Sequence, residues 1–284
     1  MNLHNVIVNR QKFIAMGATA IAGGIVAASS YFYVNNESQS LVVEQIQIPL
    51  KGLGSALEGF KIVQLSDFHL RPFTQIDLIQ EAVRISNSLK PDLVVLTGDY
   101  VWYEVEAIFD LTLTLAALQA KHGVYSTMGN HDLWTDVGIV RQGFDEVGLP
   151  ILDNQGLVIT EGKDSLYIAG LDDGWSGKPD LRTAMSDWQE GMPVVLLMHE
   201  PDLADKYSLD GRIGLQLSGH THGGQIRFPG IGAVILPYLG WKYDMGLYQV
   251  RDMWLYTNRG IGVTNEPVRY NCPPEITEFI LVGA

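Results

Sequence analysis

The sequence feature that most constrains the fold is a series of short apolar runs, most of which are followed at once by polar residues. Short runs rich in Val, Leu and Ile are typical of buried strands, and helical stretches between them are typical of α/β layering. We therefore predict an α/β fold with at least one largely buried sheet. Its strands are expected at 41–48, 61–65, 93–97, 123–128, 166–171, 194–198, 213–217, 248–256 and 276–282.

Two stretches between these runs have helical spacing. The first is expected to begin after Thr74, a typical N-cap residue, and to end before Pro91. Its apolar residues recur at Ile79, Val83 and Leu89. The second stretch carries on one face Ile108, Leu111, Leu115 and Leu118.

Polar side chains that can act as ligands gather just after the predicted strands. In α/β sheets, ligands bind outside the carboxyl ends of the strands, so these side chains are expected to converge on one edge. Each fragment alone also has an ordinary interpretation, as a turn or a capping loop. Five of the seven histidines belong to the set, however, and only His4 and His122 lie outside it. The set consists of Asp67, His69, Asp99, Asn130, His131, His199, His220 and His222.

The mixture of carboxylate, amide and imidazole groups in this set suits borderline divalent metals such as manganese, iron or zinc. The single cysteine, Cys272, excludes an internal disulfide and a cysteine-based zinc cage, and we expect it to be a passive small side chain. We therefore predict a metal site built from oxygen and nitrogen ligands.

The order of these motifs matches a known family. Asp-x-His, Gly-Asp, Gly-Asn-His-Asp, His and Gly-His-x-His follow one another as in the calcineurin-like metallophosphoesterases, which this chain resembles from residue 41 to 284. The resemblance implies a four-layer sandwich of two mixed β-sheets flanked by helices, with two divalent metal ions at one edge. The first ion would be bound by Asp67, His69 and His222. The second would be bound by Asn130, His199 and His220, with Asp99 bridging the two.

The resemblance also implies the chemistry, with Asp99 and His131 as catalytic residues. Two cations about 3.5–4 Å apart can generate a bridging hydroxide that attacks a phosphoester in line with the leaving group. His131 would protonate or stabilise the leaving oxygen, because its neighbour Asn130, also expected to contact substrate, points it into the site. Many members carry an acidic residue three positions after the bridging aspartate, which orients this histidine. Here that position is Trp102, so water or a backbone carbonyl must orient His131, or its catalytic role is weaker.

A finer resemblance comes from four short segments: GLDD (170–173), HEP (199–201), GHTHGGQ (219–225) and TNRGIG (257–262). They are similar to the membrane-associated branch of the family. Some members of that branch cleave the pyrophosphate of UDP-2,3-diacylglucosamine, a precursor in lipid A biosynthesis. Arg259 would then hold a substrate phosphate, or alternatively form a salt bridge within the acidic body.

The N-terminal segment 13–34 contains no charged residue and is long enough to cross a bilayer as an apolar helix. It is interpreted as a retained membrane anchor, a cleaved signal peptide or a buried helix, in that order of preference. Residues 1–12, with Arg10 and Lys12, form a cytoplasmic n-region, 35–40 a linker, and 41–284 the metallophosphoesterase domain. The positive-inside rule predicts that the chain is associated with the inner or plasma membrane and that its body is extracytoplasmic. This orientation conflicts with a lipid A precursor as substrate, which requires the cytoplasmic face.

The net charge narrows the class of partners. Residues 1–36 carry +2 of a total of −13, which leaves −15 on the remainder, and such an acidic body disfavours nucleic acid as a partner. The expected partners are a phosphorylated small-molecule or lipid-linked substrate and the membrane bilayer. The leading hypothesis is a membrane-held phosphodiesterase or pyrophosphatase. The alternatives are an exported broad-specificity phosphomonoesterase and a non-catalytic metal-binding interaction scaffold.

Overall fold

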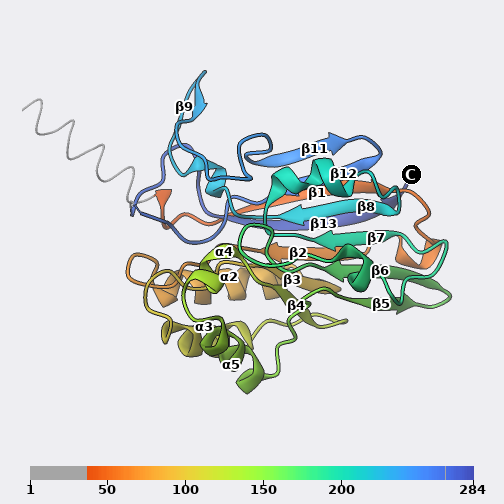
Figure 1. Ribbon diagram of the computed structural model, residues 1–284, viewed down its shortest axis with the longest axis horizontal. Coiled ribbons are helices and arrows are strands. Elements are labelled where there is room, and N and C mark those ends of the chain that lie inside the picture. The colour runs from red at the N-terminus through yellow and green to blue at the C-terminus, as the bar shows by residue number, and fades with distance from the viewer. Residues whose placement is uncertain (1–36, 266) are drawn as a thin grey trace, which may run out of the picture.

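The computed structural model describes residues 37–265 and 267–284, which form two mixed β-sheets packed face to face (Figure 1). In the first sheet the strand order is β1-β13-β2-β3-β4. β2, β3 and β4 are parallel, as are β1 and β13, whereas β13 is antiparallel to β2. The bounds are β1 (Val42–Leu50), β2 (Lys61–Leu65), β3 (Leu93–Thr97), β4 (Val124–Thr127) and β13 (Glu275–Gly283).

The second sheet has the order β11-β12-β8-β7-β6-β5. Its four central strands are parallel, and the two outer strands run antiparallel to their neighbours. A separate hairpin pairs β9 with β10. The bounds are β5 (Gln155–Glu161), β6 (Asp164–Gly170), β7 (Val194–Leu197), β8 (Ile213–Ser218), β9 (Arg227–Phe228), β10 (Gly232–Ala233), β11 (Gly246–Val250) and β12 (Met253–Thr257).

Three helices cover the outer face of the first sheet: α2 (Ile76–Ser88), α3 (Ala107–Leu115) and α5 (Val137–Val147). The last of these is capped at both ends. Asp136 accepts hydrogen bonds from the N–H groups of Gly138 and Ile139, and Gly148 ends the helix at φ 70°. The shorter helices are η1 (Ser55–Leu57), α4 (Asn130–Trp134), α6 (Leu181–Ala184), η2 (Pro201–Leu203), α7 (Ala204–Tyr207) and η3 (His222–Gly224).

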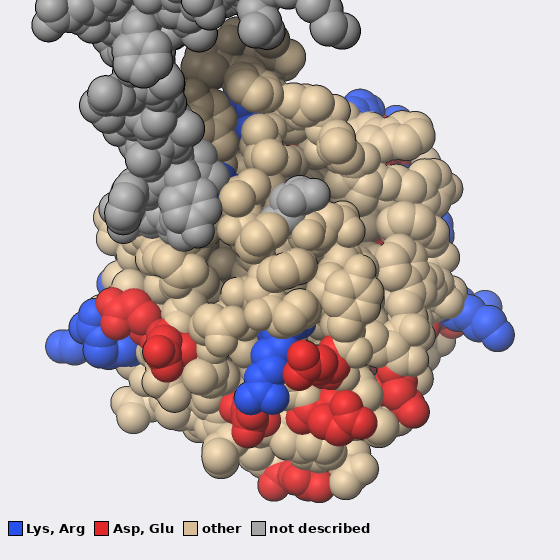
Figure 2. Space-filling model, turned by 90° about the vertical axis from the view of Figure 1, so that its left-hand side faces the viewer, with Lys and Arg blue, Asp and Glu red and all other residues tan. Residues whose placement is uncertain are grey.

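Apolar side chains fill the spaces between the layers. Ile62 and Val95 of the first sheet meet Val195 and Leu215 of the second in a fully buried core. The outer face of the second sheet is covered by α6, α7 and loop residues such as Tyr243. Because seven strands of the two sheets run in the same direction, their carboxyl ends lie on one side of the molecule, at the left of Figure 1. Figure 2 views that side, on which the charged side chains gather in the lower part.

The predicted α/β fold with two mixed sheets and flanking helices is confirmed. Two details of the prediction were wrong. The run 248–256 is not one strand but the hairpin β11–β12, which turns at Arg251 with φ 54°. Thr74 is not the N-cap of α2, a place taken by Gln75; its hydroxyl instead accepts a hydrogen bond from the Val263 N–H, 3.2 Å away.

The predicted n-region 1–12 and the apolar helix 13–34 lie outside the described residues. Among the residues that are described, no helix is long and apolar enough to cross a membrane. The described part of the predicted linker is attached to the domain. The Glu37 carboxylate accepts a hydrogen bond from the Cys272 N–H, and the Ser38 hydroxyl accepts one from the Arg269 N–H.

The core beneath the first sheet leads to a test of this packing. Phe144 of α5 is fully buried and lies edge-on against Tyr100, 4.6 Å between ring centroids. We expect Phe144→Ala to lower the free energy of unfolding by about 3–5 kcal/mol, because it removes a large buried ring. The side chain of Leu113 on the neighbouring α3 is 70% exposed, so Leu113→Ala should change the free energy of unfolding by less than about 0.5 kcal/mol. Urea denaturation measures both, and equal effects would contradict the assigned layer.

Candidate metal centre

The structure brings the seven predicted metal ligands together at the carboxyl-end edge of both sheets. Each lies within a few residues of the end of a strand, Asn130 as the first residue of α4 and His222 as the first residue of η3, so the topology places side chains far apart in sequence side by side. All seven are buried. Asp67 and His69 follow β2, Asp99 follows β3, Asn130 follows β4, His199 follows β7, and His220 and His222 follow β8.

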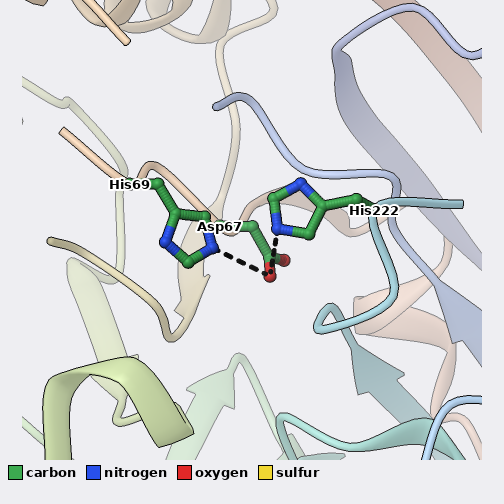
Figure 3. Close-up of side chains that lie close together, drawn as sticks. All are labelled: Asp67, His69 and His222. Carbon is green, nitrogen blue, oxygen red and sulfur yellow. Dashed lines mark ion pairs between the residues drawn. The ribbon is translucent and has the colours of Figure 1, made fainter. Parts of the chain in front are cut away.

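The first group of ligand atoms belongs to Asp67, His69 and His222 (Figure 3). The Oδ1 of Asp67 lies 3.3 Å from Nε2 of His222 and 4.0 Å from Nε2 of His69. The carboxylate also accepts a hydrogen bond from the His220 N–H at 3.0 Å, which fixes its orientation. These three side chains are the set that the resemblance implied for the first metal ion.

A second group consists of Asp99, His199 and His220. The Oδ2 of Asp99 lies 3.1 Å from Nε2 of His199 and 3.4 Å from Nε2 of His69, which belongs to the first group. The Asp99 carboxylate therefore lies between the two groups, where a bridging ligand has to be. Its other oxygen, Oδ1, accepts a hydrogen bond from the His131 N–H at 2.9 Å.

Several buried polar atoms that face this centre have no hydrogen-bond partner among residues 37–265 and 267–284. Leaving such atoms unpaired is costly, so a group that satisfies them all at once is expected. Divalent cations fit, because the atoms are imidazole nitrogens and an amide oxygen, which bind zinc, manganese and iron. The atoms are Nε2 of His69, Oδ1 of Asn130, Nε2 of His199, Nδ1 of His220 and Nε2 of His222.

The remaining ring nitrogens of two histidines donate to backbone carbonyls. Nδ1 of His199 donates to the Thr97 carbonyl at 2.6 Å, and Nε2 of His220 donates to the Tyr238 carbonyl at 2.7 Å. Each contact fixes the tautomer and directs the lone pair of the other nitrogen into the centre.

The surroundings of Asp67 and His220 favour the protonation states that bind a metal, whereas those of His199 favour its protonated form. Burial alone would raise the pKa of Asp67, but the imidazoles of His222 and His199 lower it to about 2. Burial lowers the pKa of His220 to about 4, which keeps its ring neutral at pH 7. Burial also disfavours charge on His199, but Asp99 raises the pKa of His199 above its ordinary value, so cation binding there would release a proton.

The backbone of the centre is strained. Most of the ligands adopt left-handed φ values, which cost a non-glycine residue about 1–2 kcal/mol. The strain turns successive side chains of a loop toward the same point, as with Asp67 and His69. The φ values are 53° at Asp67, 42° at His69, 58° at Asp99, 73° at His220 and 51° at His222.

Two glycines allow the loops to approach closely. A Cβ atom on Gly129 would lie 2.4 Å from Oδ1 of Asp99, and one on Gly219 would lie 2.0 Å from Oγ of Ser66. Neither space can hold a side chain. The glycines of the Gly-Asn-His-Asp and Gly-His-x-His motifs are therefore required by contact between loops.

Asp132 is a site residue that sequence reasoning missed. Its fully buried carboxylate accepts hydrogen bonds from the N–H groups of Asp99 and Gly129, both at 2.9 Å, and of Tyr100 at 2.8 Å. It therefore joins the loop after β3 to the loop after β4. Its place at the end of the Gly-Asn-His-Asp motif was the available signal.

Arg269 was also missed, since nothing in the sequence distinguishes it from a surface arginine. It is fully buried and donates to the carbonyls of Arg259, Gly260 and Cys272 at 2.8–3.0 Å. Its Nη2 also lies 3.4 Å from Nδ1 of His222. The loop after β12 is thereby held against the first ligand group.

Arg259, predicted to hold a substrate phosphate, is paired with carboxylates. Nη2 donates to Glu44 at 2.7 Å and Nε lies 2.5 Å from Oε2 of Glu275. These pairs correspond to the salt-bridge alternative. A role of Arg259 in phosphate binding stays a prediction.

His131 lies among aromatic rings instead of hydrogen-bonding to a carboxylate. Its ring centroid is 4.1 Å from that of Trp102, 4.7 Å from that of Trp134 and 5.0 Å from that of His69. Within the described residues, no backbone carbonyl or carboxylate forms a hydrogen bond with the His131 ring, and the indole of Trp102 packs against it. Burial lowers the pKa of His131.

A pocket of about 630 Å³ opens over the ligands. Its floor includes His69, Asp99 and His220, and most of its walls are apolar. Trp134 and Trp175, with ring centroids 4.7 Å apart, form one side of the pocket, and the segment after β8 forms the other side. The arrangement suits a substrate that presents a phosphoryl group to the floor and apolar groups to the walls.

Comparison with known proteins agrees with this geometry. The calcineurin-like phosphoesterase family model matches residues 60–224. The chain is 34% identical to the uncharacterized metallophosphoesterase YkuE of Bacillus subtilis, over 96% of this chain and 97% of that one. It is 30% identical to the phosphodiesterase YaeI of Escherichia coli, over 97% and 100%. A Danio rerio transmembrane protein with a metallophosphoesterase domain is 32% identical, over 96% of this chain and 65% of its own length. The chain therefore belongs to the calcineurin-like phosphoesterase family.

Proposed function

We propose that the chain is a membrane-held, two-metal phosphodiesterase or pyrophosphatase. The observation that carries the proposal is the position of the Asp99 carboxylate between two buried ligand groups at the floor of an apolar-walled pocket. All seven predicted ligands are present and buried, which speaks against a scaffold that has lost its chemistry.

In this proposal the two ligand groups hold the cations, with Asp99 shared between them. A bound pair of divalent cations supplies Lewis-acid charge to the phosphoryl oxygens and lowers the pKa of the attacking water. The protein fixes the distance between its two groups through Asp67, which accepts from the His220 N–H, and through Asp132, which joins the loops of Asp99 and Asn130.

His131 is the residue proposed to serve the leaving group. Its ring lines the pocket and is held by Trp102 and Trp134. A neutral imidazole at that place donates one hydrogen bond to the oxygen that develops charge as the ester bond breaks. Trp102 keeps the ring plane fixed without supplying a charge, so His131 acts here without a carboxylate partner.

The proposed substrate is a phosphodiester or pyrophosphate that carries an apolar group, with UDP-2,3-diacylglucosamine as a candidate. The apolar walls of the pocket support this class. The uncharged stretch 13–34, interpreted as a retained anchor, supports a membrane location, as does the similarity to a relative named as a transmembrane protein. An anchored enzyme meets lipid-linked substrates at high local concentration.

The first test is turnover of a bis-aryl phosphodiester by protein loaded with manganese or zinc. Asp99→Ala and His220→Ala should each lower kcat more than about 10³-fold, because each removes a ligand that nothing else replaces. Leu113→Ala is the control and should retain activity. Undiminished turnover in both ligand variants would contradict the proposed metal centre.

The same preparations separate the substrate classes. The wild-type kcat/KM should be higher for the diester than for the matching aryl monoester, and UDP-2,3-diacylglucosamine should release UMP. A monoester preferred over the diester would favour the exported phosphomonoesterase instead.

Asp132→Asn tests the residue that positions the loops. The amide nitrogen cannot accept from a backbone N–H, so at least one buried donor loses its partner. We expect activity to fall about 10–100-fold and to be lost at a lower chelator concentration than in the wild type. Loss of stability with unchanged sensitivity to chelator would show a structural role only.

The role of His131 predicts a dependence on the leaving group. His131→Ala should lower kcat about 10²–10³-fold for an aryl ester with a poor leaving group, and much less for a nitrophenyl ester, whose anion needs no proton. Steady-state kinetics with the two esters measures this difference. Equal losses for both would remove His131 from that step.

A further inference from the structure

An uncharged, exposed segment lies next to the metal centre. Residues 228–241, here called the apolar hairpin, contain no charged residue and lie between Arg227 and Lys242. They include β10 and, in Phe228, the last residue of β9. The segment is unusual in a chain whose body is otherwise acidic.

The apolar hairpin presents large side chains to solvent. Ile231 and Ile235 are each 78% exposed, and Trp241 is 69% exposed. Ile231 occupies the turn between Gly230 and Gly232, whose φ values are 76° and 86°, so it forms the tip. A cluster of exposed apolar side chains of this size marks a surface that another molecule or a membrane covers.

The root of the apolar hairpin is firmly attached to the domain. Arg227 pairs with Asp244 at 2.6 Å and also donates to the Gly223 carbonyl at 2.7 Å. Lys242 pairs with Asp205 at 2.7 Å. Both flanking cations are therefore used within the domain, and the part that projects is apolar.

The apolar hairpin is continuous with the pocket over the metal centre. Phe228, Val234 and Ile235 line the pocket that contains His220 and His222. A molecule covering the tip would therefore also cover one wall of the pocket. Figure 1 shows β9 projecting beyond the edge of the sheets on the side of their carboxyl ends.

The chain enters the described domain close to the same place. Glu37 accepts a hydrogen bond from the Cys272 N–H, and the Cys272 thiol contacts the His222 carbonyl at 3.1 Å. The uncharged stretch 13–34 ends three residues before Glu37. A membrane tether formed by that stretch would thus start near the pocket and the root of the apolar hairpin.

We propose that the occupant of the apolar hairpin is the lipid bilayer itself. The tip, with Ile231 and Ile235, inserts at the boundary between headgroups and acyl chains, and Trp241 lies at headgroup level. Insertion at the membrane interface requires aromatic and aliphatic side chains on an element whose base is polar.

This inference rests on the proposed function and specifies it. With the apolar hairpin in the bilayer, the pocket opens toward the headgroups. The phosphoester of a membrane lipid then reaches the metal ligands without leaving the membrane, while its acyl chains remain among those of the other lipids. The substrate class is therefore a lipid-borne phosphodiester or pyrophosphate.

The insertion is tested with the full chain in vesicles of phosphatidylethanolamine and phosphatidylglycerol. An environment-sensitive fluorophore is attached to Ile231→Cys and, as a control, to Leu209→Cys, which is 68% exposed in the native protein and lies before β8, at the opposite end of the sheet. Native Cys272 is buried and should not be labelled. Nitroxide-bearing lipids should quench the label at 231 and not that at 209. Two results would overturn the proposal. The first is that the label at 231 is not quenched in the vesicles. The second is that the label at 231 is quenched in detergent and that this quenching increases with protein concentration, since a second copy of the chain would then be the occupant.

A kinetic arm separates this inference from the proposed function. One aryl phosphodiester is used in water-soluble form and in a form with a long alkyl chain incorporated in the vesicles. Ile231→Asp should leave kcat/KM unchanged for the soluble diester and lower it at least about tenfold for the vesicle-borne one. Leu209→Asp should change neither. Equal turnover of the vesicle-borne diester by Ile231→Asp and wild type contradicts the inference, whereas a wild type inactive on both diesters contradicts the proposed function.

Discussion

The carboxylate of Asp99 is the point on which the rest of the centre depends. It lies within 3.4 Å of a histidine from each ligand group, and its own backbone N–H is held by the buried Asp132. Both sheets have to be packed before these side chains can meet, because His69 follows β2 and His199 follows β7. Burying charged and polar ligands without a partner costs free energy, and cation binding offsets this cost.

Much of this arrangement could be predicted from the sequence because it follows from topology. Parallel strands end at a common edge, so the residues after the apolar runs at 61–65, 93–97 and 213–217 were expected to converge, and they do. What could not be predicted depends on tertiary contacts. The carboxylate of Asp132 and the guanidinium of Arg269 act through backbone groups of other loops, and backbone donors and acceptors leave no mark in a sequence pattern.

Trp102 and Arg259 show that the functional roles of side chains were also only partly predictable from the sequence. The family pattern has an acidic residue where this chain has Trp102, which left water, a backbone carbonyl or a weaker catalytic role as the alternatives for His131, whereas the indole of Trp102 packs on the imidazole. For Arg259 the sequence left two alternatives, a substrate phosphate or a salt bridge within the acidic body, and its guanidinium pairs with two glutamates. In both cases a side chain's surroundings decide its role. The same holds for the segment 228–241, whose exposure beside the pocket gives it a meaning that composition alone does not.

The central claim is that the two ligand groups bind two cations. The most direct measurement is the metal content of purified protein, determined by elemental analysis after equilibrium dialysis against manganese or zinc. We expect two ions per wild-type chain and fewer in Asp99→Ala, because the Asp99 carboxylate serves both groups. One ion or none per wild-type chain, or two retained in Asp99→Ala, would contradict the claim.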